Sequence, residues 1–444
     1  MKRYIPFILV GIIFVLAALL SGVLLYLKNQ PPQARTIQPV VTVQPMEPDS
    51  ALWGLNYPNE YSSFLQTATN HTATTYGGSS QRSYLLEDPR LAILYAGSAY
   101  AKEFNQARGH ANSLVDIRAT ARVDATTHAT CYSCKSSDNP SLWAQMGMQA
   151  FDAMSFSAMS QKINNPIGCA NCHEAGTMRL VITNPAVDAA LKAEGIDWRT
   201  ASRQEMRSLV CANCHVTYFF AGTGKLLTVP WADGTRVEDI LQYENSLDVS
   251  DWTYPGTGTQ MIKARHPDYE LYTADSTHYK AGVACADCHM PYVRDGAMKY
   301  SSHDVMSPLL DPYQSCGQCH TNVDYVLGRV GIIQDEVTNA KISAEDALID
   351  TITALKGATA RSGVDADQLN QARQLDRNAQ FMWDFVSAAN STGFHNPDEA
   401  LRILRNATDL ARQAQMKAAQ AAGDPSLLTT GVYESQNPPP TATP

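Results

Sequence analysis

The chain has 444 residues, which is enough for two or three domains and a sizeable buried core. Its net charge of −9 argues against nucleic acid as a partner, because nucleic-acid binding needs a basic face. All ten cysteines lie in five Cys-x-x-Cys pairs, so none remains for a disulfide.

Residues 1–28 begin with Lys2 and Arg3 and continue as an apolar run from Tyr4 to Leu27 without a charged side chain. The run is long enough to cross a bilayer as a helix. A cleaved signal peptide is the alternative, but its apolar core is shorter and a small-residue cleavage site follows it. We expect an uncleaved membrane anchor, with the positive N-terminus in the cytoplasm and the remainder outside.

The rest of the chain divides into segments of different composition. Residues 29–50 carry five prolines and little apolar periodicity, which indicates an extended linker. Residues 51–336 contain every cysteine and predict an irregular region with short helices that wrap around cofactors. Residues 337–422 show apolar side chains at three- and four-residue spacing, which predicts two or three long helices that pack within the chain or form a dimer interface. The periodic stretches are Ile342–Leu355, Asp367–Ala389 and Pro397–Ala422. Residues 423–444 end in a proline-rich run and are expected to be disordered.

The five cysteine pairs indicate c-type haem. In such a site two cysteines form thioethers to the porphyrin, and a histidine directly after the second cysteine takes one axial face of the iron. Zinc also binds paired cysteines, but the pairs are odd in number here and four of them are followed by histidine. These four, named the second to fifth motifs, are Cys169, Cys172 and His173; Cys211, Cys214 and His215; Cys285, Cys288 and His289; and Cys316, Cys319 and His320. The predicted fold class is therefore mainly α, a multihaem cytochrome c fold on the outer side of a bacterial membrane.

The first motif departs from this form, because Cys131 and Cys134 are followed by Lys135. Lysine binds iron only as the neutral amine, which burial against the haem and the bond to iron both favour. With Lys135 on one face, the other face of the iron is open to a small substrate unless a further ligand closes it. A degenerate site that has lost its histidine is the alternative.

A low-spin haem that transfers electrons often takes a histidine on each face of the iron, so the four regular haems would need four further histidines. Seven histidines lie outside the motifs, and spacing alone does not choose among them. They are His71, His110, His128, His266, His278, His303 and His395.

One lysine-type motif followed by four histidine-type motifs resembles the ammonia-forming cytochrome c nitrite reductases, over roughly residues 90–422. Three flanking stretches agree with that family: Arg108-Gly109-His110, Cys214-His215-Val216-Thr217-Tyr218-Phe219-Phe220, and Lys263-Ala264-Arg265-His266-Pro267. The resemblance implies that Tyr218 and His266 are active-site residues. It assigns the distal haem ligands to His110, His278, His303 and His395, and leaves His71 and His128 without a role.

The resemblance also implies an active-site arginine. Alignment of Asp116 with the family's aspartate places this arginine at Arg122. Arg118 is the competitor, because the loop before Cys131 is shorter here than in better-known members. We favour Arg122.

Two positions depart from the familiar members, which use a glutamate and a glutamine to help bind calcium beside the active haem. Here these positions are Thr217 and Arg265. Calcium requires oxygen ligands, and a guanidinium would repel it. The sequence therefore resembles the calcium-independent branch of the family, and we expect five haems and no calcium at this position.

The implied reaction converts nitrite to ammonium with six electrons and eight protons. Arg122 and His266 would hydrogen-bond the anion, His266 would supply the first proton because its pKa lies nearest neutral, and Tyr218 would position a proton. Nitric oxide, hydroxylamine and sulfite are further possible substrates. The alternatives are an electron conduit without substrate and a multihaem enzyme directed at hydroxylamine or sulfite.

The family resemblance further implies a homodimer through the long C-terminal helices and a periplasmic or membrane-attached location. The expected electron donors are a membrane tetrahaem quinol dehydrogenase or another cytochrome. The membrane anchor at the N-terminus favours delivery at the membrane.

Overall fold

A computed structural model describes residues 13–23 and 39–437. The chain forms two units, Met1–Val41 and Thr42–Pro444. In the first unit, residues 13–23 are helical and exposed; the rest of the expected anchor and the first part of the linker lie outside the described residues. Within the described ranges, no helix is both long and apolar enough to cross a membrane.

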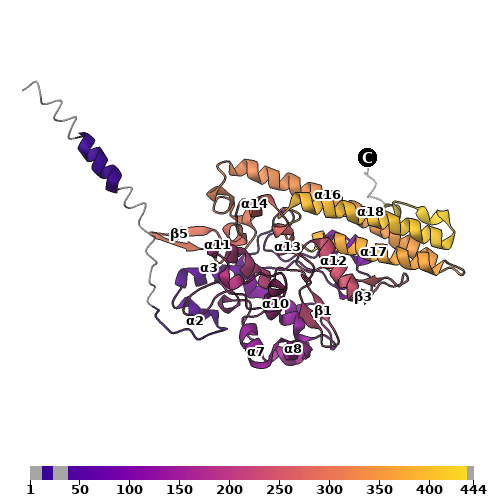
Figure 1. Cartoon of the computed structure of the whole chain (residues 1–444), viewed down its shortest axis with the longest axis horizontal. Coiled ribbons are helices and arrows are strands. Elements are labelled where there is room, and N and C mark those ends of the chain that lie inside the picture. Colours follow the sequence, from indigo (N-terminus) through magenta and orange to yellow (C-terminus); the bar gives the residue numbers. More distant parts are fainter. Residues whose placement is uncertain (1–12, 24–38, 438–444) are drawn as a thin grey trace, which may run out of the picture. The chain divides into compact units, whose positions relative to one another are not determined.

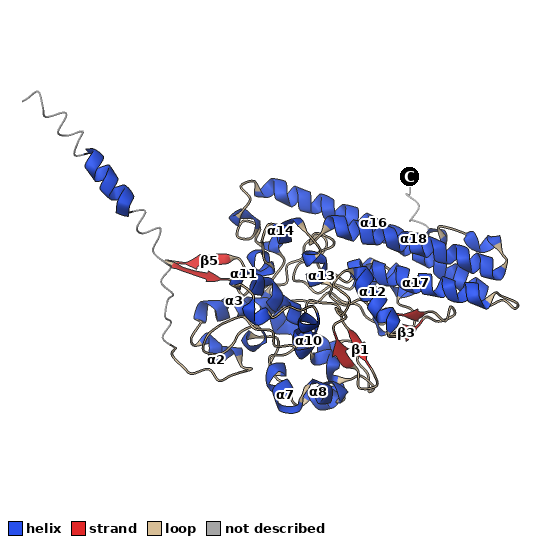
Figure 2. Ribbon diagram, viewed as in Figure 1, coloured by secondary structure: helices blue, strands red, loops and turns tan. Residues whose placement is uncertain are grey.

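The first part of the second unit is built from short elements, as Figures 1 and 2 show. Its α-helices are α2 (Ser50–Gly54), α3 (Pro58–Thr69), α4 (Tyr84–Glu87), α5 (Arg90–Leu94), α6 (Ser113–Ala119), α7 (Asn139–Met146), α8 (Met148–Ala153), α9 (Phe156–Ser160), α10 (Pro185–Ala193), α11 (Arg203–Leu209), α12 (Val237–Ser246), α13 (Asp268–Thr273), α14 (Thr277–Lys280) and α15 (Cys285–His289). Its 3-10 turns are η1 (Ala99–Ala101), η2 (His110–Asn112), η3 (Ala129–Tyr132), η4 (Cys169–Asn171), η5 (Trp198–Thr200), η6 (Val210–Asn213), η7 (Pro308–Leu310) and η8 (Cys316–Gln318).

The described strands form three antiparallel hairpins. They pair β1 (Phe219–Ala221) with β2 (Leu226–Thr228), β3 (Trp252–Thr253) with β4 (Gln260–Met261), and β5 (Tyr292–Asp295) with β6 (Met298–Ser301). Strand β1 follows Tyr218 directly, and β4 precedes the stretch that ends in His266. One hairpin therefore adjoins the stretch that carries Tyr218, and another adjoins the stretch that carries His266.

Three long helices, α16 (Val323–Thr359), α17 (Ala366–Ser387) and α18 (Pro397–Ala422), pack side by side along one edge of the unit (Figure 1). The side chains of Asn322, Asp365 and Asn396 cap their first turns. Helix α18 buries a row of alanines, which lets the neighbouring helices approach closely. The prediction of a mainly α chain with an irregular region and long C-terminal helices is confirmed.

The first long helix is longer than its apolar periodicity suggests. It begins at Val323 rather than near Ile342. Gly328 and Gly331 lower the helix propensity of its first half, and much of that half faces solvent. The periodic signal therefore comes only from the buried second half.

The expectation of disorder from Gly423 onward is wrong for residues 424–437, which include η9 (Pro425–Leu428) and α19 (Val432–Gln436). The buried Asp350 carboxylate accepts hydrogen bonds from the backbone of Gly431 and Val432 at 3.2 and 3.0 Å. The Gln415 amide donates to two more carbonyls of this segment. These partners lie far away in the sequence, so composition alone does not reveal them.

Two apolar clusters matter for the site. The larger joins the long helices to the middle of the chain and includes Tyr95, Trp231 and Trp383. A smaller one surrounds the first motif. In it Tyr132, which lies between the two cysteines, stacks on Phe156 with ring centroids 4.3 Å apart. The first motif therefore has an apolar support of its own.

Candidate haem sites and active site

Short helical turns present the motif residues. In the second, third and fifth motifs the backbone N–H of the histidine donates to the backbone carbonyl of the first cysteine at 2.9 Å. The fourth motif forms helix α15. Such a turn places both cysteines and the following histidine on one side of the backbone, as covalent haem attachment requires. In the first motif the Lys135 N–H donates instead to Tyr132 O at 2.9 Å.

Three motif histidines each face one of the expected distal histidines. The ring centroids are 6.1 Å apart for His173 and His303, 6.4 Å for His278 and His320, and 6.1 Å for His289 and His395. Two imidazoles that bind one metal ion from opposite sides, through bonds of about 2 Å, have centroids about 6 Å apart. The residues of these three sites therefore fit a haem iron held between two histidines.

The remaining motif histidine, His215 of the third motif, has two histidine neighbours. Its ring lies 6.1 Å from that of His266. Burial lowers the pKa of His110 to about 4, and the charges of His215 and Lys135 add to this shift. Because these two charges act on it, His110 also lies near His215 and Lys135. The structure thus brings His110, His215, His266 and Lys135 into one neighbourhood.

The first motif is fixed by backbone contacts. The Ser113 hydroxyl donates to Lys135 O at 2.8 Å, and the Asn139 amide donates to Tyr132 O at 2.7 Å. Among the residues that the structure describes, the Lys135 amine has no hydrogen-bond or ion-pair partner, and the side chain is half-buried. Its nitrogen is therefore available as a ligand.

The two candidate arginines have different surroundings. Arg118 donates to Ser160 O and Ile163 O at 3.1 and 2.6 Å, which ties α6 to the loop after α9. The Arg122 guanidinium lies over the Tyr100 ring at 4.7 Å, and its charge acts on Cys131 of the first motif. Of these two candidates, Arg122 is therefore the one whose charge acts on this motif, together with that of Arg265.

Arg265 is buried behind Tyr218. Its guanidinium donates to the carbonyls of Tyr218 and Lys263 at 3.1 and 3.0 Å, and to both oxygens of Asp251 at 3.2 and 2.7 Å. Burial opposes the charged form, but Asp251 raises the pKa of Arg265, so it stays cationic. Burial also raises the pKa of Tyr218 well above its usual value, so this phenol keeps its proton.

His266 has unusual backbone and side-chain environments. Its backbone φ is +48°, a left-handed conformation that is rare for residues other than glycine. Its Nδ1 is buried without a partner among the described residues. Burial, with the charges of Lys135 and His215, lowers the pKa of His266 to about 3. The expected near-neutral pKa is therefore wrong, and the imidazole is neutral.

The stretch that carries Arg265 and His266 is anchored by a buried ion pair, which the sequence did not reveal. Lys263 Nζ lies 2.6 Å from Asp384 Oδ1, and the Tyr95 hydroxyl donates to the same oxygen. Removing one partner of such a pair costs about 3–5 kcal/mol. Asp384 lies in α17, 121 residues along the chain from Lys263, so no local motif predicts it.

Tyr100 is a second residue that sequence patterns missed. Lys263 Nζ lies 5.0 Å from its ring centroid, on which Arg122 also stacks. Burial acts to raise the pKa of the Tyr100 phenol, but Arg122, Arg265 and Lys263 outweigh it and lower that pKa. Tyr100 sits in a short turn without a motif, so only the fold brings it here.

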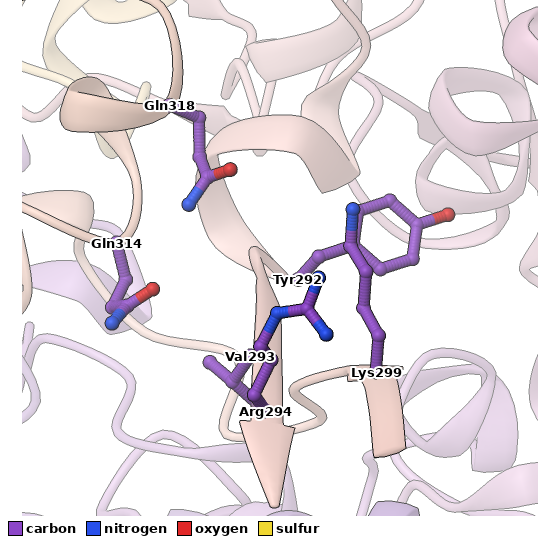
Figure 3. A pocket seen from close by; sticks show the side chains of 6 residues that line it. All are labelled: Tyr292, Val293, Arg294, Lys299, Gln314 and Gln318. Atoms are coloured by element: carbon purple, nitrogen blue, oxygen red, sulfur yellow. The ribbon is translucent and has the colours of Figure 1, made fainter. Parts of the chain in front are cut away.

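A hollow of about 320 Å³ lies between hairpin β5–β6 and the fifth motif. Figure 3 shows Tyr292, Val293, Arg294 and Lys299 of the hairpin, with Gln314 and Gln318 across the hollow. None of the active-site candidates lines it. Its position beside Cys316 and Cys319 relates it to haem attachment rather than to the first motif.

Known proteins share this architecture. The family described as cytochrome c552 matches residues 49–441. A cytochrome c-552 of Parabacteroides distasonis is 39% identical over 373 residues, covering 82% of this chain and 75% of the relative. One of Bacteroides fragilis is 36% identical over 395 residues, covering 85% and 78%. The structure of the cytochrome c nitrite reductase catalytic subunit of Desulfovibrio desulfuricans, described with two calcium sites, superposes with a TM-score of 0.83 at 32% identity, covering 89% of this chain and 91% of that one.

Proposed function

The chain belongs to the cytochrome c552 family, and we propose that it is a pentahaem enzyme that reduces nitrite to ammonium. What carries the proposal is a convergence in space. In the one motif that lacks histidine, the charges of Arg122 and Arg265 act on Cys131, and that of Lys135 acts on His266. Tyr218 lies beside Arg265, whose guanidinium is 5.4 Å from its ring centroid.

The haem-binding residues would be the five cysteine pairs with Lys135 and eight histidines. The pairs His173–His303, His289–His395 and His278–His320 would hold three irons, as their ring distances support. His215 and His110 would hold the iron of the third motif, and Lys135 alone that of the first motif. The haem held by Cys131, Cys134 and Lys135 would supply an iron that takes a small anion as ligand and exchanges single electrons.

The charge balance of the site suits an anion. Lys263 is paired with Asp384, and Arg265 with Asp251. Arg122 has no carboxylate partner among the described residues; its Nε donates only to the Thr120 hydroxyl, at 3.2 Å. The remaining guanidinium N–H groups are therefore free to bind the nitrite oxygens and stabilise their charge.

Protons reach the substrate from neutral donors. Tyr218 keeps its phenolic proton, and Arg265 fixes the backbone of Tyr218 through the carbonyl at 3.1 Å. His266 is a neutral imidazole that carries one N–H. An anion bound beside it would raise its pKa and let it exchange protons with solvent.

We also infer that no calcium binds at this position. The Arg265 guanidinium already binds the carbonyls of Tyr218 and Lys263, together with the Asp251 carboxylate. These oxygens are the kind of ligand that calcium requires, and Thr217 supplies no carboxylate in addition. The positive charge of the Arg265 side chain would replace that of the calcium ion.

The proposed assembly is a periplasmic homodimer that receives electrons from a membrane quinol dehydrogenase or another cytochrome. The first half of α16 leaves Tyr325 and Ile332 exposed at 66% and 47%, which suits contact with a second copy. Sedimentation of the holoprotein tests this: a monomer at micromolar concentration would contradict it.

Turnover by the purified holoprotein tests the function. Reduced viologen supplies electrons, nitrite is the substrate, and ammonium is measured as product together with viologen consumed. Six viologen equivalents oxidised per ammonium formed would support the proposal. A haem-loaded protein that forms no ammonium from nitrite would contradict it and leave the electron-conduit alternative. Hydroxylamine and sulfite, offered separately, show whether nitrite is preferred.

A further inference from the structure

The ring nitrogens that face away from the proposed haem irons have two kinds of partner. Nδ1 of His173, His289 and His303 lies 3.0, 2.9 and 2.9 Å from backbone carbonyls of Met178, Met306 and Ser301. Nδ1 of His215 and of His395 each lies 3.4 Å from the carboxylate of Asp268. The second group therefore faces a charged acceptor instead of a neutral one.

Asp268 is held firmly between the two rings. It is 6% exposed and begins helix α13. The Asn390 backbone N–H and side-chain amide donate to its two oxygens at 2.9 and 3.1 Å. The next residue, Tyr269, donates its N–H to His215 O at 3.0 Å. The carboxylate cannot swing away from either histidine without breaking these bonds.

The two histidines belong to different haem sites. His215 follows the cysteines of the third motif, and His395 faces His289 of the fourth motif with centroids 6.1 Å apart. The side chains of Cys134 and Cys214 contact each other, as do those of Cys211 and Cys285. The third motif thus adjoins both the first and the fourth, and Asp268 lies where electrons would pass toward the first.

We propose that Asp268 is a positioning residue that lowers the reduction potentials of the haems of the third and fourth motifs together. A carboxylate hydrogen-bonded to a ligating imidazole increases its donor strength. Asp268 makes such a hydrogen bond with His215 at 3.4 Å. Its 3.4 Å contact with His395 Nδ1 lacks hydrogen-bond geometry, so at that ring the carboxylate acts through its negative charge. The added electron density and the negative charge both favour ferric over ferrous iron. The remaining histidine-ligated haems, whose imidazoles have carbonyl partners or none, keep higher potentials. The pair beside the active site therefore holds its electrons less tightly and releases them readily toward bound substrate.

Redox titration of the purified holoprotein, with the haems resolved by absorbance and electron paramagnetic resonance, tests this for Asp268→Asn. Asparagine keeps the size of the side chain and presents a neutral carbonyl oxygen. If the variant changes the ferric preference about tenfold, as changes around metal ligands do to metal binding, each midpoint rises by about 59 mV. Two haems should rise and three should stay unchanged.

Two further variants keep the test decisive. Asp376→Asn alters another buried carboxyl, which accepts a hydrogen bond from the Thr259 hydroxyl at 3.0 Å, and should move no potential. If Asp268→Asn fails to load haem, Asp268→Glu takes its place, and a change confined to the same two haems is expected. Unchanged potentials, or an equal shift of all five, would overturn the proposal. It rests on haem attachment and not on nitrite, so a protein without nitrite turnover leaves this readout intact.

Discussion

The first motif and the other four have nearly the same sequence but different surroundings. In three of the regular sites two imidazoles face each other 6.1–6.4 Å apart, a distance that one iron spans. Around Lys135 the fold gathers a guanidinium, phenols and a neutral imidazole instead. The difference teaches that the change from histidine to lysine comes together with surrounding groups that suit an anion, which the regular sites lack among the described residues.

Replacing the lysine tests the contrast most severely. Lys135→Ala, with haem loading intact, should reduce nitrite turnover by more than the roughly 10²–10³-fold that loss of one electrostatic donor costs. Lys135→His, which copies the regular motifs, is the matched control for ligand type. Steady-state rates with a viologen donor measure both; full activity in the alanine variant would show that Lys135 has no role.

Arg122 and Arg118 form a natural pair of variants. Arg122→Leu should lower kcat/KM for nitrite by about 10²–10³-fold, because its free guanidinium N–H groups would bind the developing charge. Arg118→Leu loses contacts to Ser160 O and Ile163 O and should lower the melting temperature with turnover largely kept. The reverse outcome would move the active-site arginine to Arg118.

The two phenols near the first motif should differ. Tyr218→Phe removes a protonated donor and should lower kcat about 10²-fold, the lower range for a positioned proton donor. Tyr100→Phe keeps the ring on which Arg122 stacks and should affect kcat less. Tyr100→Leu removes that ring and should raise KM as well. Equal rates in wild type and Tyr218→Phe would remove Tyr218 from the proton path.

Glu244 affects stability behind the site rather than chemistry in it. Both its carboxyl oxygens are buried without partners among the described residues, and burial raises its pKa to about 8 from 4.5. Between these values the folded protein holds a proton that the unfolded chain has lost, so stability falls as pH rises. Melting temperatures taken near pH 5 and pH 8 should differ less in Glu244→Gln than in wild type. An identical pH dependence in both would contradict the raised pKa.

Chelation should have the smallest effect. Exhaustive dialysis against a calcium chelator should leave turnover unchanged, because Arg265 already binds the oxygens near Tyr218. Metal analysis of the dialysed enzyme accompanies the rate. Activity that is lost on chelation and restored by calcium would refute the inference.

The same contrast separates what sequence could predict from what it could not. The haem-attachment motifs consist of residues adjacent in sequence, so the sequence alone identifies them. Apolar periodicity likewise predicted the long helices. Contacts between distant segments could not be predicted from the sequence. They are the contacts of Asp384 with Lys263, of Asp268 with two histidines, and of Asp350 with the C-terminal segment. Each of these aspartates is a lone carboxylate in a helix, and its meaning depends on which loop the fold brings against it.

The pairing of distal and motif histidines shows the same limit. Family resemblance supplied His110, His278, His303 and His395 as candidates, but only the ring distances indicate which motif three of them face. His266 was expected to be a near-neutral acid, yet burial lowers its pKa to about 3. Burial is a property of the folded chain, and residue type does not reveal it.

The most direct test of the central claim is the ferric spectrum of the purified holoprotein before and after nitrite is added. We predict one high-spin haem among low-spin ones, with a high-spin signal that changes on nitrite addition while the low-spin signals stay constant. The signal should be altered in Lys135→Ala. A spectrum with five low-spin haems and no response to nitrite would contradict the account.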